Sequence, residues 1–237
     1  MRSDSGSTGS SNDLAVHLGL GSSYLGSPGR EDQSGSGLLL GMAGAIAINE
    51  RFSFGIVRMD TWLGLDDDQF EDSDSLDSSM IAVDLMLPYL QFRAGDDDLQ
   101  IPIRVGPNLV VGRWDVDGPS TTRNERHLGL GVALEVEPTW RLLHGGGHSL
   151  SLTSYLGYGT GSGEASRQVD SVDESDSADY NRLAYGLGLR WEVGSGSLGL
   201  SYIHRSLMFD ESSVTQESEF GFEGILISFA QVIGPPR

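Results

Sequence analysis

The sequence predicts an all-β protein, an antiparallel up-and-down transmembrane β-barrel of ten strands, with eight or twelve strands as the neighbouring alternatives. Three observations predict this fold. Apolar residues recur at every second position over segments of roughly 10–15 residues, which is the period of a strand. Long acidic connections alternate with short turns, as in consecutive hairpins. One face of the segments carries Leu, Val and Ile, whereas the other is rich in Gly, Ala and Ser.

The composition excludes several other classes. The chain has 237 residues, a formal charge of −19 and no cysteine. The negative charge disfavours binding to the phosphate backbone of nucleic acid. The lack of cysteine excludes disulfides and thiolate metal ligands. The longest nearly apolar run, Leu38–Ile48, is far shorter than the roughly 20 residues that a membrane-spanning helix needs.

We divide the chain into residues 1–12, a disordered polar segment, residues 13–233, a single β-barrel domain, and residues 234–237, a short tail. No change of composition interrupts the central part. The first residues lack the apolar stretch of a secretory signal.

The alternation is clearest in Leu128–Val136, where Leu or Val stands at each even position between glycines, an alanine and a glutamate. It recurs in segments near residues 13–26, 37–49, 51–65, 79–93, 99–114, 126–141, 148–159, 180–193, 197–209 and 219–233. The long acidic connections are residues 27–36, 66–78, 115–125, 160–179 and 210–218. The short turns lie near residue 50 and at residues 94–98, 142–147 and 194–196.

Small residues on one face suit the interior of a narrow barrel, so we expect the Leu, Val and Ile face to point into lipid. Aromatic residues on that outer face fall toward the strand ends, as in the two interfacial belts of a membrane barrel. The predicted belts consist of Tyr24, Tyr158 and Tyr185 at the acidic-loop end and Tyr89, Trp140 and Trp191 at the short-turn end.

In this pattern the chain resembles the bacterial outer-membrane β-barrel proteins over residues 13–233. Its last segment, Phe222–Phe229, is similar to the terminal-strand assembly signal of such barrels, with a glycine followed by alternate hydrophobic residues. The resemblance implies the outer membrane of a Gram-negative bacterium, a signal peptide already removed, and handling by the barrel-assembly machinery. It also implies a monomer that contacts the lipid bilayer and lipopolysaccharide.

Two irregularities qualify the pattern. Pro88, Pro102, Pro107 and Pro138 fall within predicted strands, where each removes a ladder donor. The segment 51–65 changes parity, and a bulge near residues 56–57 would keep Arg58 and Asp60 off the lipid.

Charged residues on the inner face form the main candidate site. Folding the chain about residues 115–125 sets Arg104 opposite Glu135 and brings Asp84 near Asn108. Because buried charges must pair, we predict a lumen charge network. Its members are Asp84, Arg104, Glu135, Glu137, Arg182, Arg190 and Glu192. Such a network either plugs the barrel or lines a narrow path for small polar solutes.

Three functional alternatives follow. The first is a structural or narrow-pore barrel with no catalytic residue, metal or cofactor. The second is a hydrolase at the outer rim, similar to the omptin proteases. Its acid–base residues would be Asp115 and Asp117 with His127, or His204 with Asp210. The third is a soluble β-barrel that binds an apolar ligand in its core. The acidic loops carry no complete calcium-binding motif, and we interpret them as solvated.

Overall fold

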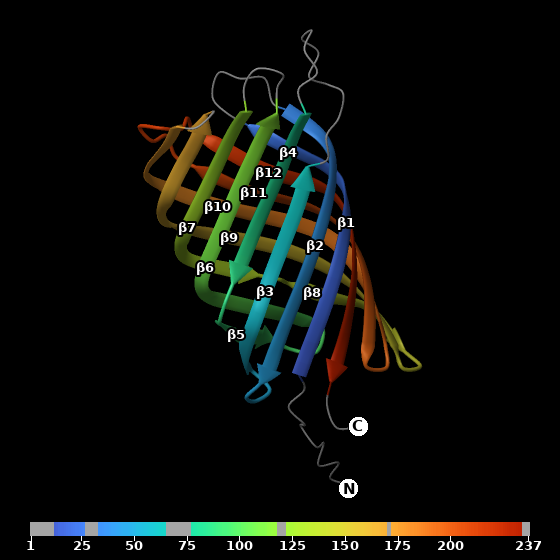
Figure 1. The fold of residues 1–237 in the computed structure, drawn as a ribbon. Coiled ribbons are helices and arrows are strands. Elements are labelled where there is room, and N and C mark those ends of the chain that lie inside the picture. The colour runs from blue at the N-terminus through green and yellow to red at the C-terminus, as the bar shows by residue number, and fades with distance from the viewer. Residues whose placement is uncertain (1–11, 27–32, 65–76, 118–121, 170–171, 234–237) are drawn as a thin grey trace, which may run out of the picture.

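A computed structural model describes residues 12–26, 33–64, 77–117, 122–169 and 172–233, and all of its regular structure is β (Figure 1). Within these residues, no helix is long and apolar enough to cross a membrane. The strands are β1 (Asn12–Gly26), β2 (Gln33–Ala47), β3 (Phe52–Gly64), β4 (Asp77–Met86), β5 (Tyr89–Gly95), β6 (Leu99–Asp117), β7 (Thr122–Val136), β8 (Thr139–Gly145), β9 (His148–Val169), β10 (Val172–Val193), β11 (Gly196–Phe209) and β12 (Ser218–Ile233).

Antiparallel pairing closes these strands into a ring. β1 pairs with both β2 and β12, and β9 pairs with both β7 and β10. The segments β4 and β5 are successive halves of one interrupted strand, and so are β7 and β8, so the ring passes through ten strands. The predicted antiparallel barrel is therefore confirmed. The start of β1 and the end of β12 pair at the short-turn end of the barrel (Figure 1).

The prolines explain both interruptions. Pro88 separates β4 from β5, and Pro138 separates β7 from β8. The other two lie within β6 opposite these gaps, where their carbonyl groups accept the N–H groups of residues beside the gaps. Leu87 donates to Pro107 over 3.3 Å, and Glu137 donates to Pro102 over 3.0 Å. A proline lacks a donor but keeps its acceptor, so β6 continues past both sites.

The predicted bulge lies at Ile56. Gly44 of β2 pairs with Val57, whereas the next residue, Ala45, pairs with Gly55, which leaves Ile56 without an opposite residue. The extra residue reverses the parity of β3, so Phe54 and Ile56 are exposed on the outer face while Asp60 is buried inside.

The predicted loop at residues 160–179 is wrong. β9 and β10 continue through it as strands of 22 residues each, and only residues 170–171 between them lie outside the described residues. Its Ser, Gly and Asp residues suggest a loop, but small residues still alternate inward there, as Ala165 and Ala178 are buried. The predicted loop at 66–78 lies almost wholly outside the described residues, as do residues 1–11 and 234–237.

The large aliphatic side chains of the alternating segments lie on the outer surface. Leu130, Leu187 and Ile227 are each more than half exposed, which would be costly for a protein surrounded by water. This arrangement is the reverse of a soluble barrel, so the alternative of a soluble carrier with an apolar core is wrong. On β10 the exposed apolar face runs from Tyr185 to Val193, about the length of a membrane-spanning strand.

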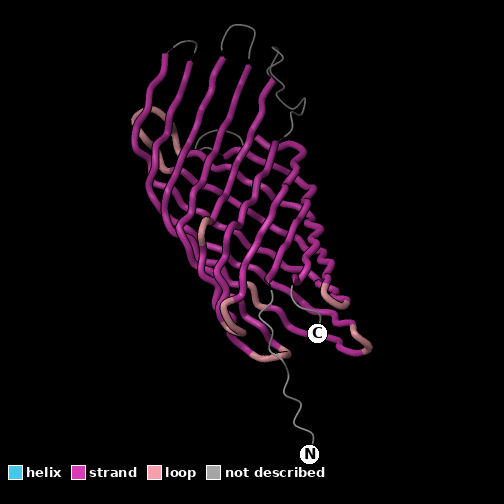
Figure 2. Tube along the Cα trace, turned by 60° about the horizontal axis from the view of Figure 1, so that its bottom comes forward, coloured by secondary structure: helices cyan, strands magenta, loops and turns pink. Residues whose placement is uncertain are grey.

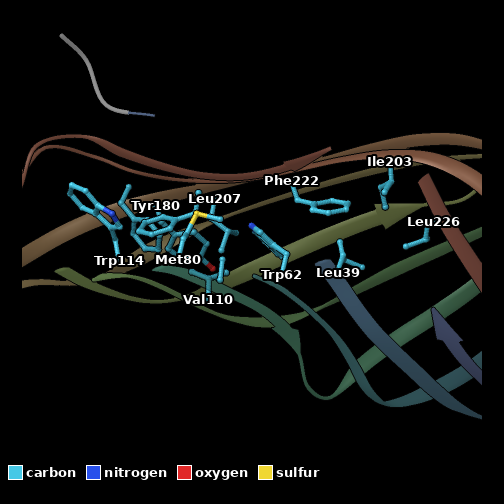
Figure 3. Close-up of a cluster of buried hydrophobic side chains, with 13 residues drawn as sticks. Leu39, Trp62, Met80, Val110, Trp114, Tyr180, Ile203, Leu207, Phe222 and Leu226 are labelled. Atoms are coloured by element: carbon cyan, nitrogen blue, oxygen red, sulfur yellow. The ribbon is translucent and has the colours of Figure 1, made fainter. Parts of the chain in front are cut away.

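The barrel interior holds a second apolar group, which we call the apolar layer (Figure 3). These side chains come from β2, β3, β4, β6, β10, β11 and β12 and pack against one another inside the barrel. Its members are Leu39, Trp62, Met80, Ala82, Val110, Trp114, Tyr180, Ile203, Leu207, Phe209, Phe220, Phe222 and Leu226.

Candidate functional site

Below most of the apolar layer, toward the short turns, the lumen is crossed by charged side chains. Ile203 and Leu226 are exceptions, because the register of β11 and β12 puts them on the short-turn side of Arg205. The step from one layer to the other is two residues along each strand, because alternate residues share a face. Three strands show it directly: Trp62 follows Asp60 in β3, Tyr180 precedes Arg182 in β10, and Leu207 follows Arg205 in β11. We call the charged group the charge layer. It comprises Arg58, Asp60, Asp84, Arg104, Glu135, Glu137, Arg182, Arg190 and Arg205.

Glu135 is fully buried at the centre of the charge layer. Its carboxylate accepts from Arg182 at 2.5 Å and from the hydroxyl of Tyr155 at 2.6 Å. Arg58 lies on the other oxygen at 2.6 Å, and Arg104 lies at 3.9 Å. A carboxylate with no exposed surface is stable in its charged form only with such partners.

Asp84 of β4 joins its strand to β10 and β11 through contacts across the lumen. It contacts Arg182, accepts from the amide of Asn108 at 2.8 Å, and lies 3.4 Å from Arg205. The hydroxyl of Tyr180 donates to the Asn108 side-chain oxygen at 3.0 Å. The predicted proximity of Asp84 and Asn108 is thus present, and two arginines from β10 and β11 join it.

Asp60 joins the layer through Arg205 at 2.7 Å and through His17 of β1. His17 and Asp60 lie on strands separated by β2, and the residue between them is Gly41. A Cβ on Gly41 would overlap both side chains. The glycine therefore allows a polar contact to reach over one strand, which gives the small inner residues a specific role beyond saving volume.

The lower part of the layer is centred on Glu137. It accepts from Arg104 at 2.8 Å and from Arg190 at 2.5 Å. The strand register sets Arg104 opposite Glu135, as the sequence predicts, but the shorter contact of Arg104 is with Glu137. Glu192 lies apart and accepts a hydrogen bond of 2.7 Å from Ser149.

Sequence reasoning left out several polar residues of the lumen. They are His17, Gln91, Tyr155 and Arg205, and each lies on the inward face of its strand and contacts another polar side chain there. Strand parity could have found Tyr155, which alternates with Gly157 and Gly159. Parity could not have shown which acid each arginine meets, because those contacts join strands far apart in the chain.

The structure places five of the six predicted belt aromatics on the outer side of the barrel. Tyr158, Tyr185, Trp140 and Trp191 are exposed, whereas Tyr24 is partly covered and donates to Glu219 at 3.1 Å. The prediction that Tyr89 belongs to the outer belt is wrong, because its side chain is 3% exposed and it pairs with Gly55 on the inner face. The break at Pro88 reverses the parity of the strand, so Leu90 points outward in its place.

Among the side chains that the structure describes, the proposed rim acid–base pairs do not form. His127 points into the lumen between the rings of Phe209 and Phe220, at centroid distances of 4.7 and 5.4 Å. Asp115 lies on the outer face, where it contacts Arg113 and Asn124. The side chain of Asp117 lies outside the described residues.

The second pair fails for a similar reason. His204 stacks on Tyr185 at 4.6 Å on the outer wall, and the contacts it makes are with Tyr24 and Glu223. Asp210 instead donates its backbone N–H to Asp179. Of the described residues, no group of three or more His, Asp or Glu side chains is arranged to hold a metal ion.

Comparison with known proteins identifies the architecture. No protein family and no curated protein matches the sequence. Among solved structures, the outer-membrane protease OmpT from Escherichia coli aligns with a TM-score of 0.57 at 9% identity, covering 94% of this chain and 97% of OmpT. The translocator domain of the autotransporter NalP from Neisseria meningitidis aligns at 0.45 and 14% identity, covering 96% and 90%. The chain has the fold of a bacterial outer-membrane β-barrel.

The chain shares its β-barrel architecture with OmpT, and an identity of 9% carries no residue correspondence. The likeness therefore supports the ring of strands and the outward apolar face. It transfers no protease activity, and the candidate site rests on the lumen contacts described above.

Proposed function

We propose that this protein is a closed outer-membrane β-barrel with a structural role, a non-conducting anchor that holds its long strands above the membrane. The observation that carries the proposal is the double occlusion of the lumen. The apolar layer and the charge layer occupy adjoining levels of the lumen, and their central side chains, among them Trp62, Glu135 and Arg182, are at most 2% exposed.

The charge layer supports closure more strongly than an apolar layer alone would. A polar path for solutes needs charged groups that contact water, whereas Glu135, Asp84 and Arg182 contact one another across the ring. To open a path, these ion pairs would have to separate inside the barrel, which leaves uncompensated buried charge. The network is therefore expected to hold the wall strands together.

The outer surface supports a location in the outer membrane. The apolar face of β10 has the length of a spanning strand, and exposed aromatics stand near both ends of it, Tyr185 above and Trp191 below. Above Tyr185 the outward residues of β10 become polar, from Asn181 to Asp173. This change marks the level at which the strands leave the lipid.

Planar-bilayer recording of the refolded chain tests the proposal. We expect no discrete conductance steps from the native protein. The matched control replaces Trp62, Arg182 and Arg205 together by alanine, which removes side chains from both layers, and is expected to conduct. A heat-dependent shift in gel mobility verifies that each protein is folded. Discrete steps from the native chain would refute closure and favour the narrow pore.

A further inference from the structure

The strands at the loop end of the barrel reach different heights. β6 pairs with β7 as far as Asp117, and β7 pairs with β9 as far as Val169. β11, in contrast, begins to pair with β10 only at Tyr180. The upper parts of β6, β7, β9 and β10 therefore form a sheet that stands above the end of β11 (Figure 2).

The last strand of this projecting sheet has an open side. Val172–Asp179 pair with β9 along one edge, and no described strand pairs with them along the other. β9 and β10 exceed a spanning strand by about 10 residues, or roughly 30 Å, so this edge lies well outside the lipid. We call Val172–Ser175 the open edge.

The direction of the backbone groups can be assigned. The carbonyl of Asp179 accepts the N–H of Asp210 on the side away from β9. Alternate residues of an antiparallel strand point their N–H and C=O groups to the same side, so Ser175 and Asp173 also face away from β9. No described backbone group bonds to these two residues on that side.

The connection between β11 and β12 marks where the open edge begins. The N–H of Ser213 donates to the carboxylate of Asp176 at 2.8 Å, and that carboxylate also accepts the N–H of Ser177 at 2.8 Å. These hydrogen bonds lower the pKa of Asp176 from its ordinary value, so it is charged at neutral pH. The connection thus covers the strand up to Asp176 and leaves Asp173 and Ser175 free above it.

We propose that the open edge binds an extended, basic peptide segment of a partner protein as an added strand. Unpaired edge groups in water are a template for such addition, in which main-chain hydrogen bonds supply affinity and alternate side chains supply specificity. The inference goes beyond the structural role of the barrel, and it holds whether or not the lumen conducts.

The negative charge of the open edge favours a basic peptide as the binding partner. The strand carries carboxylates on both faces, with Asp173 and Asp179 outward and Glu174 and Asp176 inward, and it contains no basic residue between residues 172 and 179. An added strand with arginine or lysine on both faces meets Asp173 on the outward face and Glu174 on the inward face. Glu174 also lies opposite Arg167 of β9, whereas Asp173 lies opposite the uncharged Gln168. A second copy of this chain would bring the same carboxylates edge to edge, which is unfavourable.

The test uses the full chain refolded in lipid nanodiscs and a fluorescent heptapeptide, Arg-Arg-Val-Arg-Arg-Val-Arg, which places arginine on both faces of an added strand. Fluorescence anisotropy measures binding, and hydrogen exchange measures protection of the amides in Val172–Ser175. We expect saturable binding and slower exchange at the open edge. The same peptide with its alternate backbone nitrogens methylated, which removes the donors on one side, is expected to bind at least tenfold more weakly.

A pair of charge variants separates edge binding from general attraction. Asp173→Asn with Glu174→Gln is expected to weaken binding at least tenfold. The matched control, Glu50→Gln with Asp97→Asn, removes the same charge from exposed turns at the opposite end and is expected to leave binding unchanged. The proposal is overturned by absent binding, by equal loss in both pairs, by indifference to methylation, or by edge protection that rises with protein concentration without peptide.

Discussion

Removing the charge of Glu135 is the most direct perturbation of the lumen. The variant Glu135→Gln keeps the size of the side chain and leaves an oxygen for Tyr155, but it removes the charge that faces Arg58 and Arg182 at 2.6 and 2.5 Å. Both arginines are nearly buried, and breaking one partner of a buried ion pair costs about 3–5 kcal/mol. We expect a loss of this size in the free energy of unfolding.

Urea unfolding of the chain in lipid vesicles, followed by tryptophan fluorescence, measures this loss. Glu50→Gln is the matched control, because Glu50 is an exposed turn residue, and its expected change is below about 0.5 kcal/mol. Among the described acids, the ion-pair partner of Arg58 is Glu135, so Arg58→Met combined with Glu135→Gln should cost less than the sum of the two. Equal, negligible changes in Glu135→Gln and Glu50→Gln would refute the buried network.

Two further predictions address the reach of polar contacts over β2 and the inside–outside assignment. Gly41→Ala places a Cβ against His17 and Asp60 and should destabilise the barrel by about 1–3 kcal/mol in the same unfolding assay. A Cβ on Gly44 of the same strand comes no nearer than 4.0 Å to a neighbouring atom, so Gly44→Ala should change the free energy of unfolding by less than about 0.5 kcal/mol. Similar values for both variants would contradict the contact of His17 with Asp60 over Gly41. Brominated lipids should quench Trp140 and Trp191, so replacing these two by phenylalanine should remove most of the quenching, whereas Trp62→Phe should leave it. Strong quenching of Trp62 would reverse the assignment of β3.

The apolar alternation of the strands could be predicted from the sequence because it depends only on neighbouring residues. Every second residue faces the same side, so the apolar alternation predicts a strand with one apolar face without reference to the rest of the chain. The pattern is seen in Leu128–Val136 and Leu183–Val193. The opposition of Arg104 and Glu135 followed from the same rule applied to a single hairpin. Even the bulge at Ile56 was visible as a change of parity.

The features that sequence reasoning missed depend on local breaks or on distant strands. The interruption at Pro88 turned Tyr89 inward, and nothing in the alternation before it indicates whether parity is kept across such a break. Acidic and small residues at 160–179 were interpreted as a loop, although strand pairing between β9 and β10 continues through them. A polar composition indicates only that a segment is exposed to water. It does not separate a loop from a strand that extends above the membrane, because both are exposed.

The sequence by itself determined the all-β class, the closed barrel with an outward apolar face, and the set of residues able to enter the lumen, since each follows from the period of a strand. Only the tertiary structure decided that Asp84 meets Arg182 and Arg205, that His17 reaches Asp60 over Gly41, and that β10 rises past β11 with one side open. Those contacts depend on ring closure, stagger and strand height. Such quantities arise from all the strands together, and no single segment of the chain encodes them.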